Sequence, residues 1–255
     1  MRINKVIIAF LFLPILLTGC AELEAILKHV EDNGVETKDV LTNGEMVRGL
    51  KEALAHGTDT AVALLHQANG FYGNEALKIL LPKEAKPVYE RLERVPLIDG
   101  FIDDAVLSIN RAAEDAAKEA GPIFKDAIAR MTIEDAKTIL TGNDSAATQY
   151  LRSNTYDQLY LAFKPKINAA LKKEYVRGLS AEDAYAKVIN TYNTASVNGM
   201  LWEQIKNNSL AEHTTRKALE GLFIKVAQEE KAIRENPVHR VTDILKRVFG
   251  YDFNS

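Results

Sequence analysis

Apolar residues recur at intervals of three, four and seven positions from Asn43 almost to the end of the chain. Side chains at this spacing share one face of an α-helix. No stretch of the sequence shows the strict alternation of a half-buried strand bounded by hairpin turns. The pattern therefore predicts an all-α fold. Because the expected helices differ in length and the proline and glycine breaks fall irregularly, an irregular multi-helix bundle is favoured over a regular four-helix one.

Proline, glycine and capping residues divide this pattern into helices. Gly121 and Pro122 interrupt the long periodic run from Ile98 to Arg130 and should kink or split it. Two later helices begin with a hydroxyl at the N-cap and an acid three residues on. These two starts are Thr132 with Asp135 and Ser180 with Asp183. The other expected helices are 46–65, 84–94, 145–173 with a kink at Pro165, 210–235, and a last one whose inner face carries Val241, Ile244, Leu245 and Val248.

The first residues follow the order of a bacterial secretion signal. Arg2 and Lys5 precede an apolar run of about 12 residues, which suits the core of a signal peptide but falls short of the ~20 that a spanning helix needs. The run ends in a motif that resembles the bacterial lipobox, Leu17, Thr18, Gly19 and Cys20. We therefore predict cleavage before Cys20 and lipid on its thiol. The alternative is an ordinary signal peptide that stops near a cysteine.

Lipid on Cys20 would make the membrane the first partner of this chain. Cys20 is the only cysteine, so an intramolecular disulfide and thiol catalysis in the body are excluded. Each buried methylene contributes ~0.8 kcal/mol, so the two or three acyl chains of a mature lipoprotein hold durably. Ala21 follows the cysteine where a retention signal would have aspartate. By similarity to enterobacterial sorting, we expect the outer membrane, facing the periplasm; a Gram-positive host would leave the protein outside its single membrane.

Three regions follow from these boundaries: a signal peptide over 1–19, a lipidated N-terminus and tether over 20–43, and a single helical domain over 44–255. Removal of residues 1–19 would leave 236 of the 255 residues and change the formal net charge from −3 to −5, because Arg2 and Lys5 are lost. The charges are mixed rather than blocked. Binding to nucleic acid is therefore not expected, and no cofactor is indicated.

The sequence contains few signals of catalysis or metal binding. The usual motifs for serine nucleophiles, zinc proteases and di-iron bundles are missing, so we predict neither catalytic nor metal-binding residues. Glu52 and His56 share a helix face and could supply two metal ligands, but a surface hydrogen bond explains the pair as well.

Polar residues interrupt the apolar face of the longest helix at Asn110, Arg111 and Glu114. Because buried polar groups must find partners, these three residues either line a cleft or form an internal salt bridge that fixes the helix register. Trp202 is the only tryptophan and lies in an Asn-rich loop, as a partner contact or tucked against the bundle.

Two further polar patterns have ordinary structural explanations. The turn from Thr141 to Ser145 feeds a helix N-terminus that could hold an anion, but Asp144 would repel one, and we expect Asp144 and Ser145 to cap the helix instead. Glu230 and Arg234 are spaced to pair on a helix, and with Glu229 and Lys231 they look like a solvated face. The alternative is that Glu229 or Arg234 turns inward.

Several ordered segments resemble a bacterial lipoprotein family known only as domain of unknown function 4197. The resemblance covers most of the chain from Glu45 to Gly250 and is weakest over 193–209. It implies a periplasm-facing helical domain, lipid-anchored or secreted, and it implies no activity or catalytic residue. The segments that carry it are Gly49–Leu54, Gly70–Tyr72, Asn110–Ala117, Pro122–Ile128, Met131–Gly142, Ala146–Tyr150, Ala218–Phe223 and Thr242–Gly250.

Three functions fit these observations. The leading hypothesis is a non-enzymatic envelope module that binds a protein or another envelope component near the membrane. The second is a carrier or sensor of a small or lipid-like ligand, which requires an enclosed apolar cavity of a few hundred Å³, about 300 Å³ or more. The third is an unrecognised envelope hydrolase, which requires two carboxylates among Glu114, Asp126 and Asp135 to converge in a cleft.

Overall fold

The computed structural model describes residues 40–88, 96–176, 179–197, 199–205 and 209–253. Cys20 and the predicted cleavage motif lie outside these residues. Leu41–Ser255 form one compact unit. Its helices are α2 (Asn43–His66), α4 (Pro96–Ala117), α5 (Ala120–Arg130), α6 (Ile133–Leu140), α7 (Ala146–Leu171), α8 (Ala181–Ala195), α9 (Leu210–Glu235) and α10 (Asp243–Phe249), with short 3-10 helices η1 (Lys83–Ala85) and η2 (Pro237–His239).

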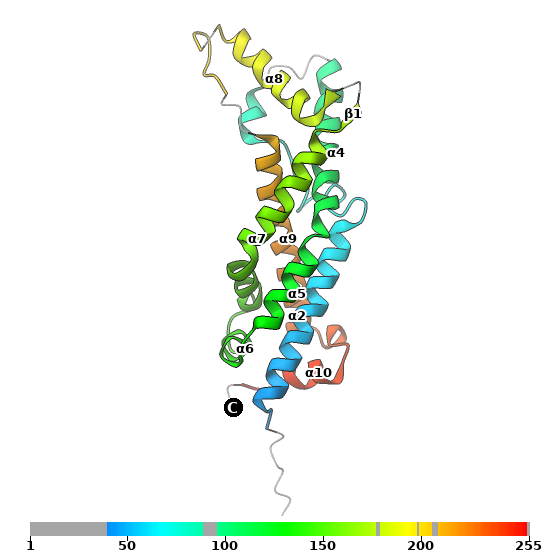
Figure 1. The fold of residues 1–255 in the computed structure, drawn as a ribbon, viewed down its shortest axis with the longest axis vertical. Helices are drawn as coiled ribbons and strands as arrows, with labels where there is room; N and C mark the ends of the chain where they lie inside the picture. The colour runs from blue at the N-terminus through cyan, green and yellow to red at the C-terminus, as the bar shows by residue number, and fades with distance from the viewer. Residues whose placement is uncertain (1–39, 89–95, 177–178, 198, 206–208, 254–255) are drawn as a thin grey trace, which may run out of the picture. The chain divides into compact units, whose positions relative to one another are not determined.

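The core of this unit lies where α2, α4, α5, α7 and α9 meet. α7 packs most extensively against α9 and α4, and α2 packs against α9 and α5. α4 and α5 follow one another along the bundle, while α8 and α10 lie at its opposite ends (Figure 1). Apolar faces repeated at helical spacing fill the interior, including the edge-to-face rings of Phe124 and Phe223 at 6.1 Å. The predicted all-α multi-helix bundle is confirmed.

Side-chain caps fix the starts of several helices. Thr132 and Asp135 form a full capping box at α6, as the sequence predicts. Ser180 accepts a hydrogen bond from the backbone N–H of Asp183 at 3.1 Å at the start of α8. A third box, which sequence inspection missed, joins Thr42 and Glu45 at α2.

Some predicted boundaries shift for identifiable reasons. The long periodic run breaks between α4 and α5, before Gly121 and Pro122 rather than at them. Pro122 then falls in the first turn of α5, where a backbone N–H has no helical acceptor in any case. α7 continues through Pro165, which is exposed, so water can satisfy the carbonyl that loses its donor. Val241 was expected to face inward, but 58% of its surface is exposed because α10 begins only at Asp243.

A short antiparallel pair joins α7 to α8. It consists of β1 (Glu174–Val176) and β2 (Leu179–Ser180), with Glu174 opposite Ser180. Over the described ranges, none of the helices combines the length and apolar character that crossing a bilayer demands.

Candidate functional site

A groove of about 290 Å³ lies between the segment 76–83 and helix α9, and we call it the 76–83 groove. The side chains of Leu80 and Ile224 remain 63% and 39% exposed, one on each side. Its α9 positions recur at intervals of three and four, so they share one helix face. The groove therefore presents apolar surface to solvent between two walls. Its lining residues are Ala76, Leu77, Lys78, Ile79, Leu80, Leu81, Lys83, His213, Lys217, Glu220, Gly221 and Ile224.

Asn110 of α4 fixes the segment 76–83, which forms one wall of the groove, through hydrogen bonds to its backbone. The Ile79 N–H donates to Asn110 Oδ1 at 2.9 Å, and Asn110 Nδ2 donates to the Ile79 carbonyl at 2.8 Å. A further bond from Asn110 Nδ2 to the Val106 carbonyl, at 2.7 Å, fixes the amide itself. Ile79 is only 2% exposed, whereas its neighbour Leu80 is 63% exposed. Successive residues of an extended segment face opposite sides, so anchoring Ile79 inward directs Leu80 outward.

Glu114 holds the turn that precedes this segment. Its Oε1 accepts hydrogen bonds from the backbone N–H groups of Phe71 and Tyr72, both at 3.1 Å. Arg111 Nη1 lies 2.6 Å from Glu114 Oε2, and Arg111 Nη2 donates to Asn69 Oδ1 at 2.9 Å. Asn69 adopts a left-handed conformation with φ of 70°, which asparagine tolerates better than most residues. Asn110, Arg111 and Glu114 thus form an internal network that positions the loop, and they do not line the groove.

Phe71 and His213 join this loop to α9. Phe71 is fully buried against α9, where a Cβ at Gly221 would lie 2.7 Å from the Phe71 ring. Only glycine permits this approach. His213 Nε2 lies 2.9 Å from the Leu80 carbonyl and must donate, since a carbonyl only accepts. Burial lowers the pKa of His213, which favours the neutral ring in this contact. Both walls of the groove are therefore fixed to each other.

The rim of the groove is basic. Lys78, Lys83 and Lys217 line it, against the single acid Glu220. Lys217 Nζ lies 2.6 Å from Glu220 Oε2, and both side chains are about half exposed. Lys78 Nζ lies 4.3 Å from the centre of the Tyr72 ring, a cation–π contact. The positive rim contrasts with the net charge of −3 of the whole chain.

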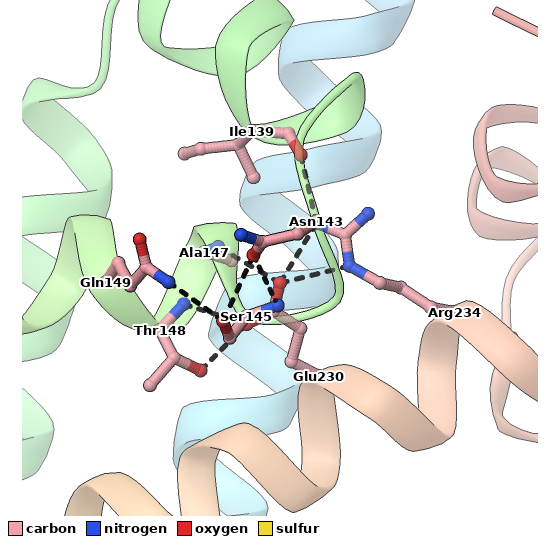
Figure 2. A network of polar contacts seen from close by, with 8 residues as sticks. All are labelled: Ile139, Asn143, Ser145, Ala147, Thr148, Gln149, Glu230 and Arg234. Carbon is pink, nitrogen blue, oxygen red and sulfur yellow. Dashed lines mark hydrogen bonds and ion pairs between the residues drawn. The ribbon is translucent and has the colours of Figure 1, made fainter.

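A buried carboxylate, which the sequence assigned to a solvated face, lies against the N-terminus of α7. Glu230 of α9 accepts hydrogen bonds from the N–H of Ala147 at 3.0 Å and the N–H of Thr148 at 2.8 Å (Figure 2). Arg234 pairs with Glu230 at 2.9 Å and donates to the Ile139 carbonyl at 2.9 Å. The side chains of Glu230 and Arg234 are 6% and 12% exposed. Assigning this pair to a solvated face was therefore wrong.

The same network corrects the expected cap of α7. Ser145 is the N-cap but makes no side-chain capping bond, and instead receives a hydrogen bond from Gln149 Nε2 at 2.9 Å. Asn143 Oδ1 accepts from the Ser145 N–H at 3.0 Å. The sequence suggested two occupants for this helix start, a bound anion or, as we expected, a local cap by Asp144 and Ser145. In the structure, the carboxylate of Glu230 occupies that position, where the helix dipole favours negative charge.

Trp202 is partly buried and packs against the core. Its ring centre lies 5.5 Å from that of Tyr192 at the end of α8. The neighbouring Met200 and Leu201 are 81% and 63% exposed. Val197 in the same turn has φ of 52°, which is rare for a β-branched residue. The exposed apolar surface of this loop therefore belongs to the neighbours of Trp202.

The carboxylates considered for hydrolysis each make a separate structural contact. Glu114 holds the turn at Phe71, Asp126 pairs with Arg130 on the surface of α5, and Asp135 caps α6. Within the described part of the chain, no group of three or more histidine, cysteine or acidic residues has the geometry of a metal site. His56, the expected partner of Glu52, is exposed.

Sequence reasoning missed the groove and its residues Leu80, Lys83, His213 and Lys217. A signal was present, since the run from Lys78 to Lys83 places three apolar residues and a proline between two lysines. The α9 wall gave a weaker sequence signal, because the residues that line it are a mixture of histidine, lysine, glutamate, glycine and isoleucine without apolar periodicity.

The described residues define an all-α bundle that carries an open, lysine-rimmed groove. The chain belongs to the family described as Protein of unknown function (DUF4197), whose model matches residues 40–250. This confirms the resemblance drawn from the ordered segments. No curated protein and no solved structure matches the chain significantly.

Proposed function

We propose that the protein is a non-enzymatic binding module of the cell envelope, held on a membrane by lipid on Cys20 and facing the periplasm, which binds a partner protein in the 76–83 groove. One observation carries the binding role: exposed apolar side chains, at Leu80 and Ile224, line a groove whose walls are fixed by buried hydrogen bonds. Exposed apolar surface on a rigid support is typical of protein interaction sites.

The engagement of Glu114, Asp126 and Asp135 in separate contacts supports binding over hydrolysis, because a hydrolase needs a convergent, available pair. Two pockets inside the bundle, beside Glu230 and beside Tyr185, measure about 20 Å³ each. That volume holds a water molecule rather than an acyl chain. These sizes favour a partner on the surface over a ligand enclosed between helices.

The anchor is tested by Cys20→Ser. The parent should take up radiolabelled palmitate and fractionate with the outer membrane, whereas the variant should do neither. A Cys20→Ser protein that still sediments with membranes, together with an unlabelled parent, contradicts the anchoring proposal.

Binding in the groove is tested by a photo-crosslinking amino acid placed at Leu80. The matched control is the same residue at Leu161, which is 71% exposed on α7. We expect one discrete crosslinked protein from position 80 that is absent from position 161 and weakened by Ile224→Ser. Equal crosslinking at both positions, or none at position 80, rejects the groove as the binding site.

A further inference from the structure

We infer that the occupant of the 76–83 groove is an extended segment of a partner protein that combines acidic and aliphatic side chains. This inference rests on the proposed binding function and adds the chemistry of the partner. Three properties of the groove carry it: the charge of its rim, its dimensions and its exposed apolar residues.

The charge of the rim selects an acidic partner. Three lysines and one glutamate line the groove, so a basic segment would meet like charges there. Like charges across an interface cost free energy and slow association, whereas opposite charges speed association and fix register. Lys83 lies on η1 and is exposed, whereas Lys217 forms an ion pair with Glu220. An incoming carboxylate can therefore pair with Lys83 directly and compete with Glu220 for Lys217.

The length of the groove fits a short extended chain. The α9 wall runs from His213 to Ile224, which at 1.5 Å per residue is roughly 16 Å. An extended peptide covers that length with about five residues.

The apolar residues give the segment its anchors. Leu80 lies beside His213 at one end of the groove and Ile224 lies at the other, and both are exposed. Two aliphatic side chains of an extended segment, one at each end, therefore remove apolar surface from water. Alternate side chains of an extended segment point the same way. Each wall carries both an exposed apolar residue and a lysine, so a segment that combines aliphatic and acidic side chains can pair both kinds with the groove.

The test measures binding of a fluorescein-labelled peptide, about six residues long, in which leucine and glutamate alternate. The full lipidated chain is placed in nanodiscs of neutral lipid, and fluorescence anisotropy is compared with empty nanodiscs. We expect saturable binding that weakens as salt is added. The same peptide with lysine for glutamate, or with serine for leucine, should not bind.

Charge-reversed variants locate the site. Lys83→Glu and Lys217→Glu should each weaken binding about fivefold or more. Lys231→Glu is the matched control, because it makes the same change on α9 outside the groove, where Lys231 is 62% exposed. Circular dichroism checks that every variant remains helical.

The inference is overturned if the leucine–glutamate peptide does not bind, or if Lys83→Glu and Lys217→Glu leave its binding unchanged. Binding of dodecanoate tests the alternative that the groove holds a small lipid-like ligand. Saturable dodecanoate binding that Ile224→Ser abolishes, without peptide binding, also overturns it and favours a carrier. If the peptide fails while crosslinking from position 80 still yields one discrete partner, the partner chemistry is wrong and the binding function stands.

Discussion

Replacing Glu230 by glutamine should destabilise the bundle strongly, although the change in shape is small. Its carboxylate receives the N–H groups of Ala147 and Thr148 and the hydroxyl of Thr148, at 2.7 to 3.0 Å, and pairs with Arg234. Glu230→Gln keeps the shape but replaces one acceptor oxygen by a donor. The new amide N–H₂ must then face either the α7 backbone donors or the guanidinium of Arg234.

The expected loss follows from burial. Removing one partner of a buried ion pair costs about 3–5 kcal/mol, because the other charge stays buried without compensation. Arg234 is 12% exposed and fits that case. The favourable interaction of the carboxylate with the α7 dipole, typically 0.3–1 kcal/mol and up to ~2 kcal/mol when partly buried, is lost as well. We therefore expect Glu230→Gln to lower the free energy of unfolding by about 3–5 kcal/mol.

Urea unfolding followed by far-UV circular dichroism measures this loss. Glu235→Gln is the matched control on the same helix, since Glu235 is 56% exposed and 3.8 Å from Lys231. It should change stability by less than about 0.5 kcal/mol. Adding Arg234→Met to Glu230→Gln should recover part of the loss, because the uncompensated charge is removed. A Glu230→Gln protein as stable as the Glu235→Gln control refutes the reasoning.

Three further outcomes follow from the structure. Burial raises the pKa of Tyr185 to about 12, from an ordinary value near 10, so ionisation favours the unfolded chain as pH rises. Between about pH 9.5 and 11.5 the parent should lose about 2 kcal/mol relative to Tyr185→Phe in urea titrations. Hydrogen bonds from Tyr160 and Lys164 lower the pKa of Glu212 to about 2, so its stabilisation is complete above about pH 5 and is lost as pH falls toward 2. Because Glu212 is 31% exposed, the loss relative to Glu212→Gln should be no more than about 1 kcal/mol in acid titrations. Gly221→Ala should destabilise by about 1–3 kcal/mol in thermal unfolding because its Cβ meets the Phe71 ring, whereas Gly121→Ala, with open space around it, should be neutral or slightly stabilising.

Local caps made some helix starts predictable, although the equally local box of Thr42 and Glu45 was missed. The Thr132 box needs only residues three apart, and the sequence shows both. The bounds of α9 could be predicted for the same reason, because Ser209 lies before its first turn and Pro237 shortly after its last. Interactions within one turn depend little on the rest of the fold.

Contacts between distant segments could not be predicted in this way. The spacing of Glu230 and Arg234 shows that they are neighbours, but not that this face of α9 meets the start of α7. The acceptor and donor of the Ala147–Glu230 bond are 83 residues apart. The groove was missed for the same reason, since Lys83 and Lys217 are brought together only by packing.

Among the residues that the structure describes, three glutamates make the same kind of contact between segments that are distant in the sequence. Glu114 of α4 binds two consecutive N–H groups of the turn at Phe71, Glu182 of α8 binds those of Leu210 and Ala211 at the start of α9, and Glu230 of α9 binds two at the start of α7. Apolar packing alone allows helices to slide, since one turn of about 5.4 Å replaces one apolar side chain by the next. The buried carboxylate of Glu230 must meet two specified N–H groups and opposes such a slide, because the slide leaves a buried charge and the start of α7 without partners. The Glu230 contact therefore opposes sliding of α9 against α7, whereas the Glu114 contact, with Asn110 beside it, fixes the turn and the segment that form one wall of the groove.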